Sequence, residues 1–94
     1  MNNLSIIEGI LIKDAETYYT KKGNSICQFF IGINNDIISI YTNDGIADYC
    51  HEFLKKGVKI RSTGKLKKGT WKNKEGNTKY KIYMEAASIE LLNI

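Results

Sequence analysis

The chain has no proline, one histidine and two cysteines among its 94 residues. Because proline cannot donate a backbone hydrogen bond within a sheet, its absence agrees with strands that bond along their whole length. A single histidine and no CxxC pair cannot supply a tetrahedral zinc site of the usual kind. Cys27 and Cys50 fall at apolar positions, which predicts buried structural thiols. We therefore expect no metal and no other cofactor.

Long apolar segments are also missing. No run approaches the roughly 20 apolar residues that a membrane helix needs, and no basic segment followed by an apolar one leads the chain. We therefore expect a cytoplasmic protein with no membrane partner. The acidic residues are scattered and no nucleophile has a histidine partner, so catalysis is not expected. The length suits a single domain, 1–94, and is too short for two separate cores.

Positive charge is concentrated in one part of the chain. Residues 55–81 hold eleven lysines and arginines against one acid, Glu75, whereas the rest of the chain has three against nine. A split of this kind points to a polyanionic partner on one side of the molecule. A solvated lysine-rich face would have the same composition, so charge by itself leaves both interpretations open.

Alternating apolar and polar residues predict strands in most of the chain. Five such segments stand at 4–13, 25–34, 37–42, 58–67 and 78–94. Gly9 interrupts the first segment, which predicts a bulge or a close backbone approach. Glu75, Gly76 and Asn77 form a hairpin turn signal before the last segment, which we expect to bend near Ala86.

The pattern changes to a helical period between the third and fourth of these segments. Apolar residues recur there at Ile46, Tyr49, Cys50, Phe53 and Leu54, the stripe of an amphipathic helix. Thr42 or Asn43 can cap its start, and Gly57 can end it. The order predicts an all-β, five-stranded Greek-key barrel of the OB-fold type, with one α-helix between strands 3 and 4.

The spacing of many residues resembles a known family. In the later part of the chain, the residues that carry the resemblance are Lys56-Gly57, Gly64-Lys65-Leu66, Lys67-Lys68, Trp71, Gly76 and Tyr80. In the earlier part, they are Gly9, Leu11, Asp14, Glu16, Tyr19 and Gly23. Together these residues resemble the bacterial single-stranded DNA-binding protein (SSB) family, and the resemblance covers nearly the whole chain.

The resemblance implies sequence-tolerant binding of single-stranded DNA, in replication, recombination or repair, by base stacking and lysine–phosphate contacts. Trp71 matches the family's hairpin tryptophan. Tyr41 matches an aromatic residue at the end of a strand, where alternation independently turns it outward. The expected contact residues are Trp71, Tyr41, Lys67, Lys68, Lys72, Lys74, Arg61, Lys59 and Phe30.

These residues also have structural interpretations. Trp71 could fold back onto the barrel or into a subunit contact, and Tyr41 could serve cross-strand packing. Phe30 could contact a base or another subunit, and Arg61 and Lys59 could simply keep their strand soluble. The family usually assembles as dimers or tetramers, so the resemblance implies a homo-oligomer.

The chain departs from the family in three places. The turn at 34–36 is short and lacks the tryptophans often found there, which predicts a smaller footprint or weaker binding. Extra residues stand at 43–45. The sequence stops at Ile94 without the acidic, aromatic-ended tail that recruits replication and repair proteins in the family. We therefore expect a trimmed barrel domain or a tailless relative of the primosomal replication protein (PriB-like) type.

Two other functions remain open. A protein-interaction subunit of a replication or primosome complex would bind single-stranded DNA more weakly. RNA binding in the cold-shock style would call for aromatic RNP-type strand motifs, which are absent, although the sequence does not separate DNA from RNA as the ligand.

Overall fold

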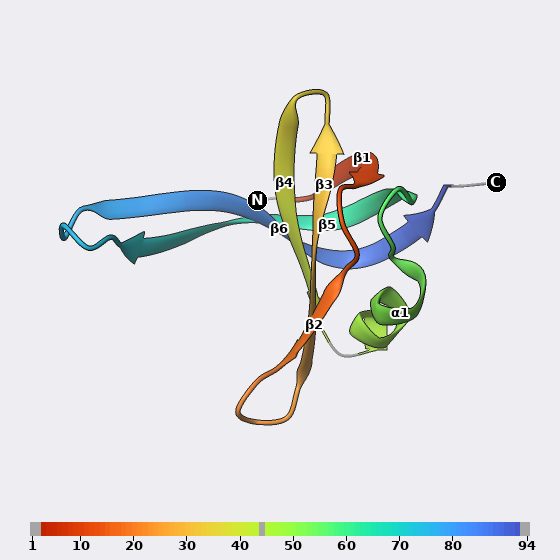
Figure 1. Cartoon of the computed structure of the whole chain (residues 1–94), viewed down its shortest axis with the longest axis horizontal. Coiled ribbons are helices and arrows are strands. Elements are labelled where there is room, and N and C mark those ends of the chain that lie inside the picture. Colours follow the sequence, from red (N-terminus) through yellow and green to blue (C-terminus); the bar gives the residue numbers. More distant parts are fainter. Residues whose placement is uncertain (1–2, 44, 93–94) are drawn as a thin grey trace.

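A computed structural model describes residues 3–43 and 45–92, which form six strands and one helix (Figure 1). In chain order the elements are β1 (Ser5–Leu11), β2 (Glu16–Tyr19), β3 (Ser25–Ile33), β4 (Asp36–Asn43), α1 (Gly45–Phe53), β5 (Lys59–Lys72) and β6 (Thr78–Leu91). Residue 44, within the extra residues expected at 43–45, and the expected strand end at 93–94 lie outside the described residues. In the described ranges no helix is long and apolar enough to cross a membrane.

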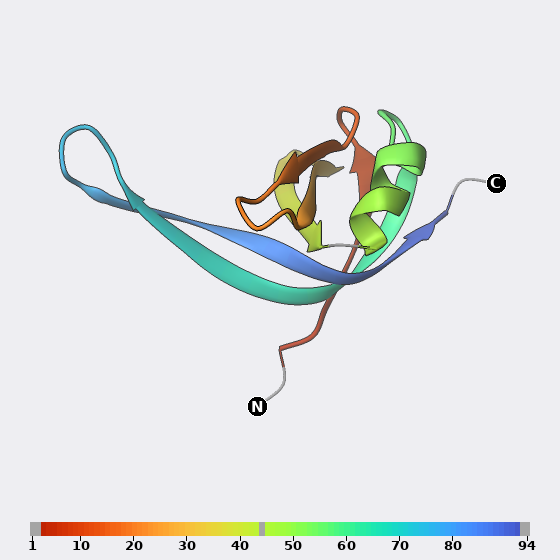
Figure 2. The ribbon, with the colours of Figure 1, turned by 90° about the horizontal axis from the view of Figure 1, so that it is seen from below.

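Five of the strands close into a barrel. β1 pairs with β5, β5 with β6, β6 with β4, β4 with β3, and β3 returns to β1. Only the pairing of β4 with β6 is parallel among these described strands. β1 and β2 share one edge of β3, because β1 meets its residues 31–32 and β2 meets its residues 25–28. Figure 2 shows α1 beside the curled strands.

The strand count expected from the sequence is corrected from five to six. The additional strand is β2, which lies between the first two segments predicted as strands, where no strand was expected. Gly23 adopts a φ of 86°, which allows the chain to reverse between residues 20 and 24, so β2 pairs with β3 at once. The expected helix position between strands 3 and 4 is not confirmed, because α1 follows the fourth strand in chain order.

β5 and β6 form an arm, here residues 65–85, that projects from the barrel (Figures 1 and 2). β5 runs to Lys72 instead of residue 67 and stays paired with β6 as far as Thr78. Gly76, at a φ of 82°, permits the tight turn between them. The register of β5 against β6 shifts by one residue between Thr63 and Gly64, where the arm leaves the barrel.

The core lies between the barrel strands and α1. Its fully buried apolar members are Leu11, Cys27, Phe29, Ile31, Ile40, Cys50, Leu54, Ile60 and Met84. Both cysteines are free and buried, as the sequence predicts. The close approach expected at Gly9 is confirmed, because a Cβ there would collide with the side chain of Ile31 and the carbonyl of Gly32.

Candidate nucleic-acid interface

One face of the sheet points away from the core across β2, β3, β4, β6 and β5. In β3 the core takes Cys27 and Phe29, so alternation turns Gln28 outward between them. In β4 Ile40 is buried, and Tyr41 points the other way. The strand registers carry this surface onto the arm, and we call it the outer face. Its aromatic and lysine members are Tyr18, Phe30, Tyr41, Lys65, Lys67, Trp71, Lys79, Lys81 and Tyr83.

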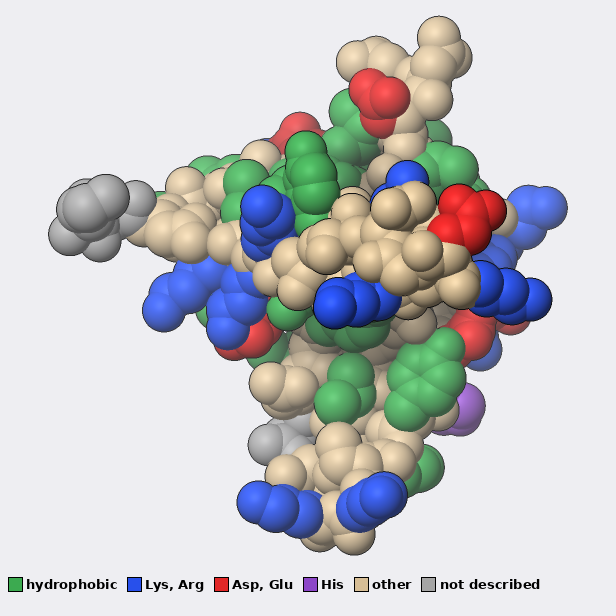
Figure 3. Space-filling model, turned by 90° about the vertical axis from the view of Figure 1, so that its left-hand side faces the viewer, with side chains coloured by type: hydrophobic (Ala, Val, Ile, Leu, Met, Phe, Trp, Pro, Cys, Tyr) green, Lys and Arg blue, Asp and Glu red, His purple; other side chains and the backbone are tan. Residues whose placement is uncertain are grey.

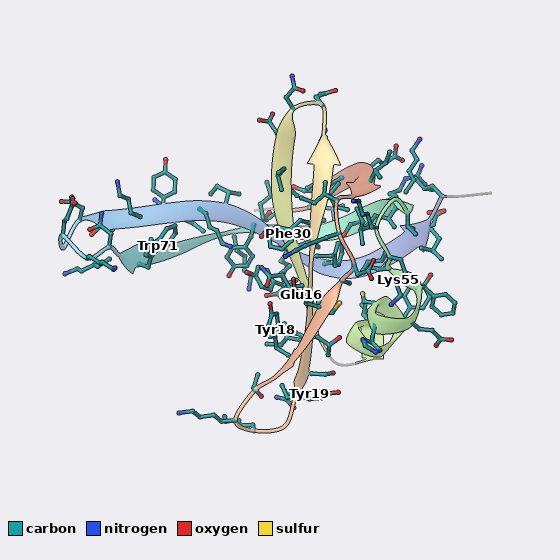
Figure 4. All side chains as sticks on the ribbon, in the orientation of Figure 1. Glu16, Tyr18, Tyr19, Phe30, Lys55 and Trp71 are labelled. Atoms are coloured by element: carbon teal, nitrogen blue, oxygen red, sulfur yellow. The ribbon has the colours of Figure 1, made fainter. Side chains whose placement is uncertain are left out.

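Trp71 lies on the arm, far from the barrel (Figure 4). Its side chain is 50% exposed, and its backbone pairs with Lys79 across the arm. No second layer covers a two-stranded arm, so the indole has no core to enter. An exposed tryptophan of this kind can stack on a base, which is one of the roles predicted from the sequence.

Alternation separates the lysines that the sequence groups with Trp71. Lys67 shares the outer face with Trp71, whereas Lys68 and Lys72 point to the opposite face of the arm. On that face Lys68 Nζ lies 4.4 Å from the ring centre of Tyr80. The residues predicted as one cluster therefore lie on two faces of the arm, and only the outer face continues onto the barrel.

β6 supplies two outer-face cations that sequence reasoning missed. Lys79 stands opposite Trp71, and Lys81 follows two residues later on the same face. In a hairpin, residues at equal distances on either side of the turn lie opposite each other. The turn at Gly76 would therefore have predicted that Lys79 lies opposite Trp71 and that Lys81 shares its face. Lys74 lies in that turn, at the tip of the arm. Figure 3 looks onto this side of the molecule and shows lysine and arginine side chains spread around its middle.

Lys67 already has a partner on the outer face. Its Nζ lies 2.8 Å from Glu85 Oε2, and the hydrogen bond to this carboxylate raises the pKa of Lys67 above its ordinary value. Both side chains are more than 40% exposed, so solvent screens the pair and its contribution to stability is small. A phosphate can therefore compete with Glu85 for this lysine.

Arg61 lies in the barrel, away from the tip of the arm. Its Nε bonds Glu8 Oε2 at 2.6 Å, and its Nη1 lies 3.2 Å from Glu90 Oε2. The hydrogen bond that Arg61 donates to Glu8, with the charges of both acids, raises the pKa of Arg61. Lys59 is two residues further from the arm on the same strand. Two carboxylates thus neutralise the guanidinium of Arg61, which was expected to contact phosphate. The structure also does not bring Arg61 and Lys59 together with Trp71.

Tyr41 meets Tyr83 of β6 on the outer face. The two ring centres are 5.2 Å apart and the rings stand at 79°, an edge-to-face arrangement. Lys81 Nζ lies 3.4 Å from the Tyr41 hydroxyl and 5.6 Å from its ring centre. Tyr41 therefore does pack across strands, as its structural interpretation predicted. Its partner ring, Tyr83, was not among the residues predicted from the sequence.

A chain of side-chain hydrogen bonds continues from Tyr41 to β2. Gln28 Nε2 donates to the Tyr41 hydroxyl at 2.8 Å. The Tyr18 hydroxyl donates to Gln28 Oε1 at 3.0 Å and to Glu16 Oε2 at 2.8 Å. A hydroxyl has one hydrogen, so the two acceptors share it. The hydrogen bond to Glu16 raises the pKa of Tyr18 above its ordinary value.

Phe30 is half-buried on the outer face of β3. Lys13 Nζ lies 4.8 Å from its ring centre, and the same ammonium pairs with Glu16 at 2.7 Å. The ring therefore has a cation over it, and Phe30 stands two residues from Gln28 on the same face of β3.

A hollow of about 350 Å³ lies between the barrel and the arm on the outer face. Its lining residues are Ile26, Tyr41, Asn43, Lys81, Tyr83 and Glu85. Among residues 3–43 and 45–92, no three histidine, cysteine or acidic side chains stand close enough together to hold a metal ion. The surface is thus equipped for stacking and for ion pairing with an anion.

Comparison with known proteins finds relatives along nearly the whole chain. The family model described as the single-strand binding protein family matches residues 1–92. The single-stranded DNA-binding protein of Treponema pallidum is 27% identical over 96% of this chain, and single-stranded DNA-binding protein A of Bacillus subtilis is 27% identical over 98%. Single-stranded DNA-binding protein 1 of Staphylococcus aureus strain MSSA476 is 28% identical over 98%. The chain spans 57%, 60% and 66% of these three relatives, respectively. It belongs to the single-strand binding protein family.

Proposed function

We propose that this chain binds single-stranded DNA with little sequence preference, along the outer face from the arm to β2. The observation that carries the proposal is the half-exposed Trp71, which shares one continuous face with the Tyr41–Tyr83 pair and with four lysines. Unpaired bases offer flat rings to aromatic side chains, and their phosphates attract lysines whatever the sequence. Replication, recombination and repair in the cytoplasm expose such strands.

The residues we assign to direct contact are Trp71, Tyr41, Tyr83, Phe30, Lys67, Lys79 and Lys81. Lys68, Lys72 and Lys74 lie on the opposite face or at the tip of the arm, so their proposed part is long-range attraction of the phosphate chain. Arg61 is held by two carboxylates, and we propose that it acts in the barrel more than on the ligand.

We place the barrel in the OB-fold class, whose five-stranded Greek-key barrels bind oligonucleotides. The closed ring of five strands, with β1 paired to both β3 and β5, supports this assignment. β2 is then the continuation of the first barrel strand along the same edge of β3, interrupted at residues 12–15.

The proposal is tested by titrating a fluorescently labelled oligo-dT with the pure protein at several salt concentrations. Binding should weaken steeply as salt rises, and the fluorescence of Trp71, the single tryptophan, should be quenched. Trp71→Ala should cost on the order of 1–3 kcal/mol of binding free energy. Phe53→Ala is the matched control, because Phe53 is an aromatic residue of similar exposure on α1. Absence of binding at low salt would rule the function out.

We also propose that the protein self-associates through β1. Leu4, Ile6 and Ile10 are 70%, 62% and 49% exposed, and Ile37 of β4 is 62% exposed. Exposed apolar residues in such number are typical of a surface that another subunit covers. Light scattering should show a dimer or larger assembly, and Ile6→Lys should shift the mass toward the monomer.

A second candidate function, a protein-interaction subunit, is favoured by the edge of β2. Thr20 N donates to Asn24 O at 2.9 Å, so the alternation of antiparallel bonds turns the backbone groups of Thr17 and Tyr19 to the other edge. Among the described residues these groups have no backbone partner, and a hollow of about 1010 Å³ between β2 and α1 lies beside them. An extended peptide can add a strand to such an edge. Thr17→Pro removes one of the edge donors and should weaken capture of a replication protein without changing oligo-dT binding.

A further inference from the structure

We infer that Cys27 of β3 and Cys50 of α1 form a redox-active thiol pair, which closes reversibly to a disulfide when a peroxide reaches it. The inference goes beyond the proposed function, because both side chains lie in the core and neither lies on the outer face. Burial alone would suit two structural thiols. A redox pair also needs its two sulfur atoms placed together and a route by which a reagent can reach them.

The strand register and the helix bring the two thiols together. Cys27 stands directly opposite Thr42 in the pairing of β3 with β4. Thr42 Oγ1 lies 3.8 Å from Cys50 Sγ, and α1 packs against both strands. Both thiols are fully buried in one core cluster, where a hydrogen bond joins them. Thiols in such contact need only a further short approach to reach the S–S bond length of about 2.05 Å.

The contact divides the roles of the two sulfur atoms. The hydrogen bond with Cys27 lowers the pKa of Cys50, although burial acts in the opposite direction. The same hydrogen bond, together with burial, raises the pKa of Cys27. The thiolate is the nucleophile in thiol oxidation, so Cys50 should react first with the oxidant and Cys27 should attack second.

The oxidation balances with hydrogen peroxide as the oxidant. The Cys50 sulfur attacks one peroxide oxygen, so an S–O bond forms and the O–O bond breaks, and the hydroxide released takes up the proton of the Cys50 thiol to give water. Cys27 Sγ then attacks the sulfenic sulfur of Cys50. The S–S bond forms, the S–O bond breaks, and the proton of Cys27 leaves with hydroxide as a second water. A dithiol reductant returns the electrons and restores both thiols.

Access to the pair depends on α1, which covers it. The helix has nine residues, and a helix of this length has little stability apart from its packing. Local opening of such an element exposes what lies beneath it without unfolding the barrel. A hollow of about 1010 Å³ lies between β2 and α1, lined by Thr17, the strand partner of Cys27, and by His51, the neighbour of Cys50. Solvent therefore reaches the residues next to both thiols.

Intact-mass spectrometry of the pure protein tests the pair directly. Hydrogen peroxide should lower the mass of the native chain by about 2 Da, and a dithiol reductant should restore it. Proteolysis without reductant should release one linked pair of peptides, which hold Cys27 and Cys50. The bond closes the loop from residue 27 to residue 50, so the oxidised chain should melt at least about 5 °C higher than the reduced chain.

Two single variants test the division of roles and leave the outer face intact. In Cys27→Ala, Cys50 has no second thiol, so peroxide should carry it beyond the sulfenic acid, with a gain of about 32 Da for the sulfinic acid. In Cys50→Ala, the mass should stay unchanged under the same treatment, because burial still raises the pKa of Cys27. Equal gains in the two variants would contradict the assignment of Cys50 as the first nucleophile.

The pair itself is refuted if the native chain keeps both thiols at a peroxide concentration that oxidises the urea-unfolded chain. A disulfide between two chains, or an oxidised chain that melts no higher than the reduced one, would overturn closure within the core. Oligo-dT binding is measured on the same reduced and oxidised samples and should be equal in both. Failure of the proposed function is thus distinguished from failure of the redox pair.

Discussion

The two faces of the arm allow a direct test of where the phosphates lie. The change is Lys79→Gln with Lys81→Gln on the outer face, compared with Lys68→Gln with Lys72→Gln on the opposite face. Both double variants remove the same charge from the same strand pair. Net charge and the distant field of the protein therefore change equally, and only direct contacts differ between the two variants.

The magnitude follows from counterion release. Each lysine–phosphate contact adds about 0.7 to the slope of log affinity against log salt for a single strand. Loss of two contacts should lower the slope by about 1.4, which corresponds to about 25-fold weaker binding at 0.1 M salt if affinities at 1 M are equal. Loss of the Lys81 contact with Tyr41 should change the affinity by the same factor at every salt concentration. The slope therefore still reports the number of lysine–phosphate contacts.

The assay is fluorescence anisotropy of labelled oligo-dT over a tenfold range of salt. The outer-face variant should show the reduced slope, and the opposite-face variant should change it by less than about 0.7. Equal reductions would mean that the strand contacts both faces of the arm. A larger reduction in the Lys68 and Lys72 variant would refute the choice of the outer face.

Three further predictions follow from individual contacts. Glu85→Gln releases Lys67 and removes a negative charge, so affinity for oligo-dT at 0.1 M salt should rise by up to about fivefold in the same titration. Gly9→Ala forces a Cβ against a side chain and a carbonyl of β3, and urea unfolding should show a loss of about 1–3 kcal/mol. The pKa of Glu16 is lowered, first by its hydrogen bond from Lys13, so its contribution to stability is present above its ordinary pKa of 4.5 and is lost as pH falls. Glu16→Gln should therefore flatten the acid limb of a plot of melting temperature against pH.

The contradicting results are equally specific. Unchanged or weaker binding by Glu85→Gln would mean that Lys67 does not meet a phosphate. Wild-type stability of Gly9→Ala would mean that β1 and β3 can move apart without cost. An acid limb that stays as steep in Glu16→Gln would assign the acid sensitivity to other carboxylates.

Patterns along the chain were sufficient for the local features of this protein. Alternation predicted most strands, and it turned Tyr41 outward because its neighbour Ile40 is apolar. The stripe at 46–54 predicted α1, and a tryptophan among polar residues and lysines predicted an exposed ring. These features depend on residues within a few positions of one another, so the order of residue types carries them.

The tertiary structure alone decided which outward residues meet. Tyr41 and Tyr83 are 42 positions apart and come together only through the parallel pairing of β4 with β6. Pairing likewise brings Glu8 and Glu90 to Arg61 from both neighbouring strands, which neutralises a predicted phosphate contact. A register between distant strands is set by the packing of the whole core, and a shift of one residue would exchange the two faces. For that reason the stacking residues could be expected one by one from the sequence, while the face that joins them could not.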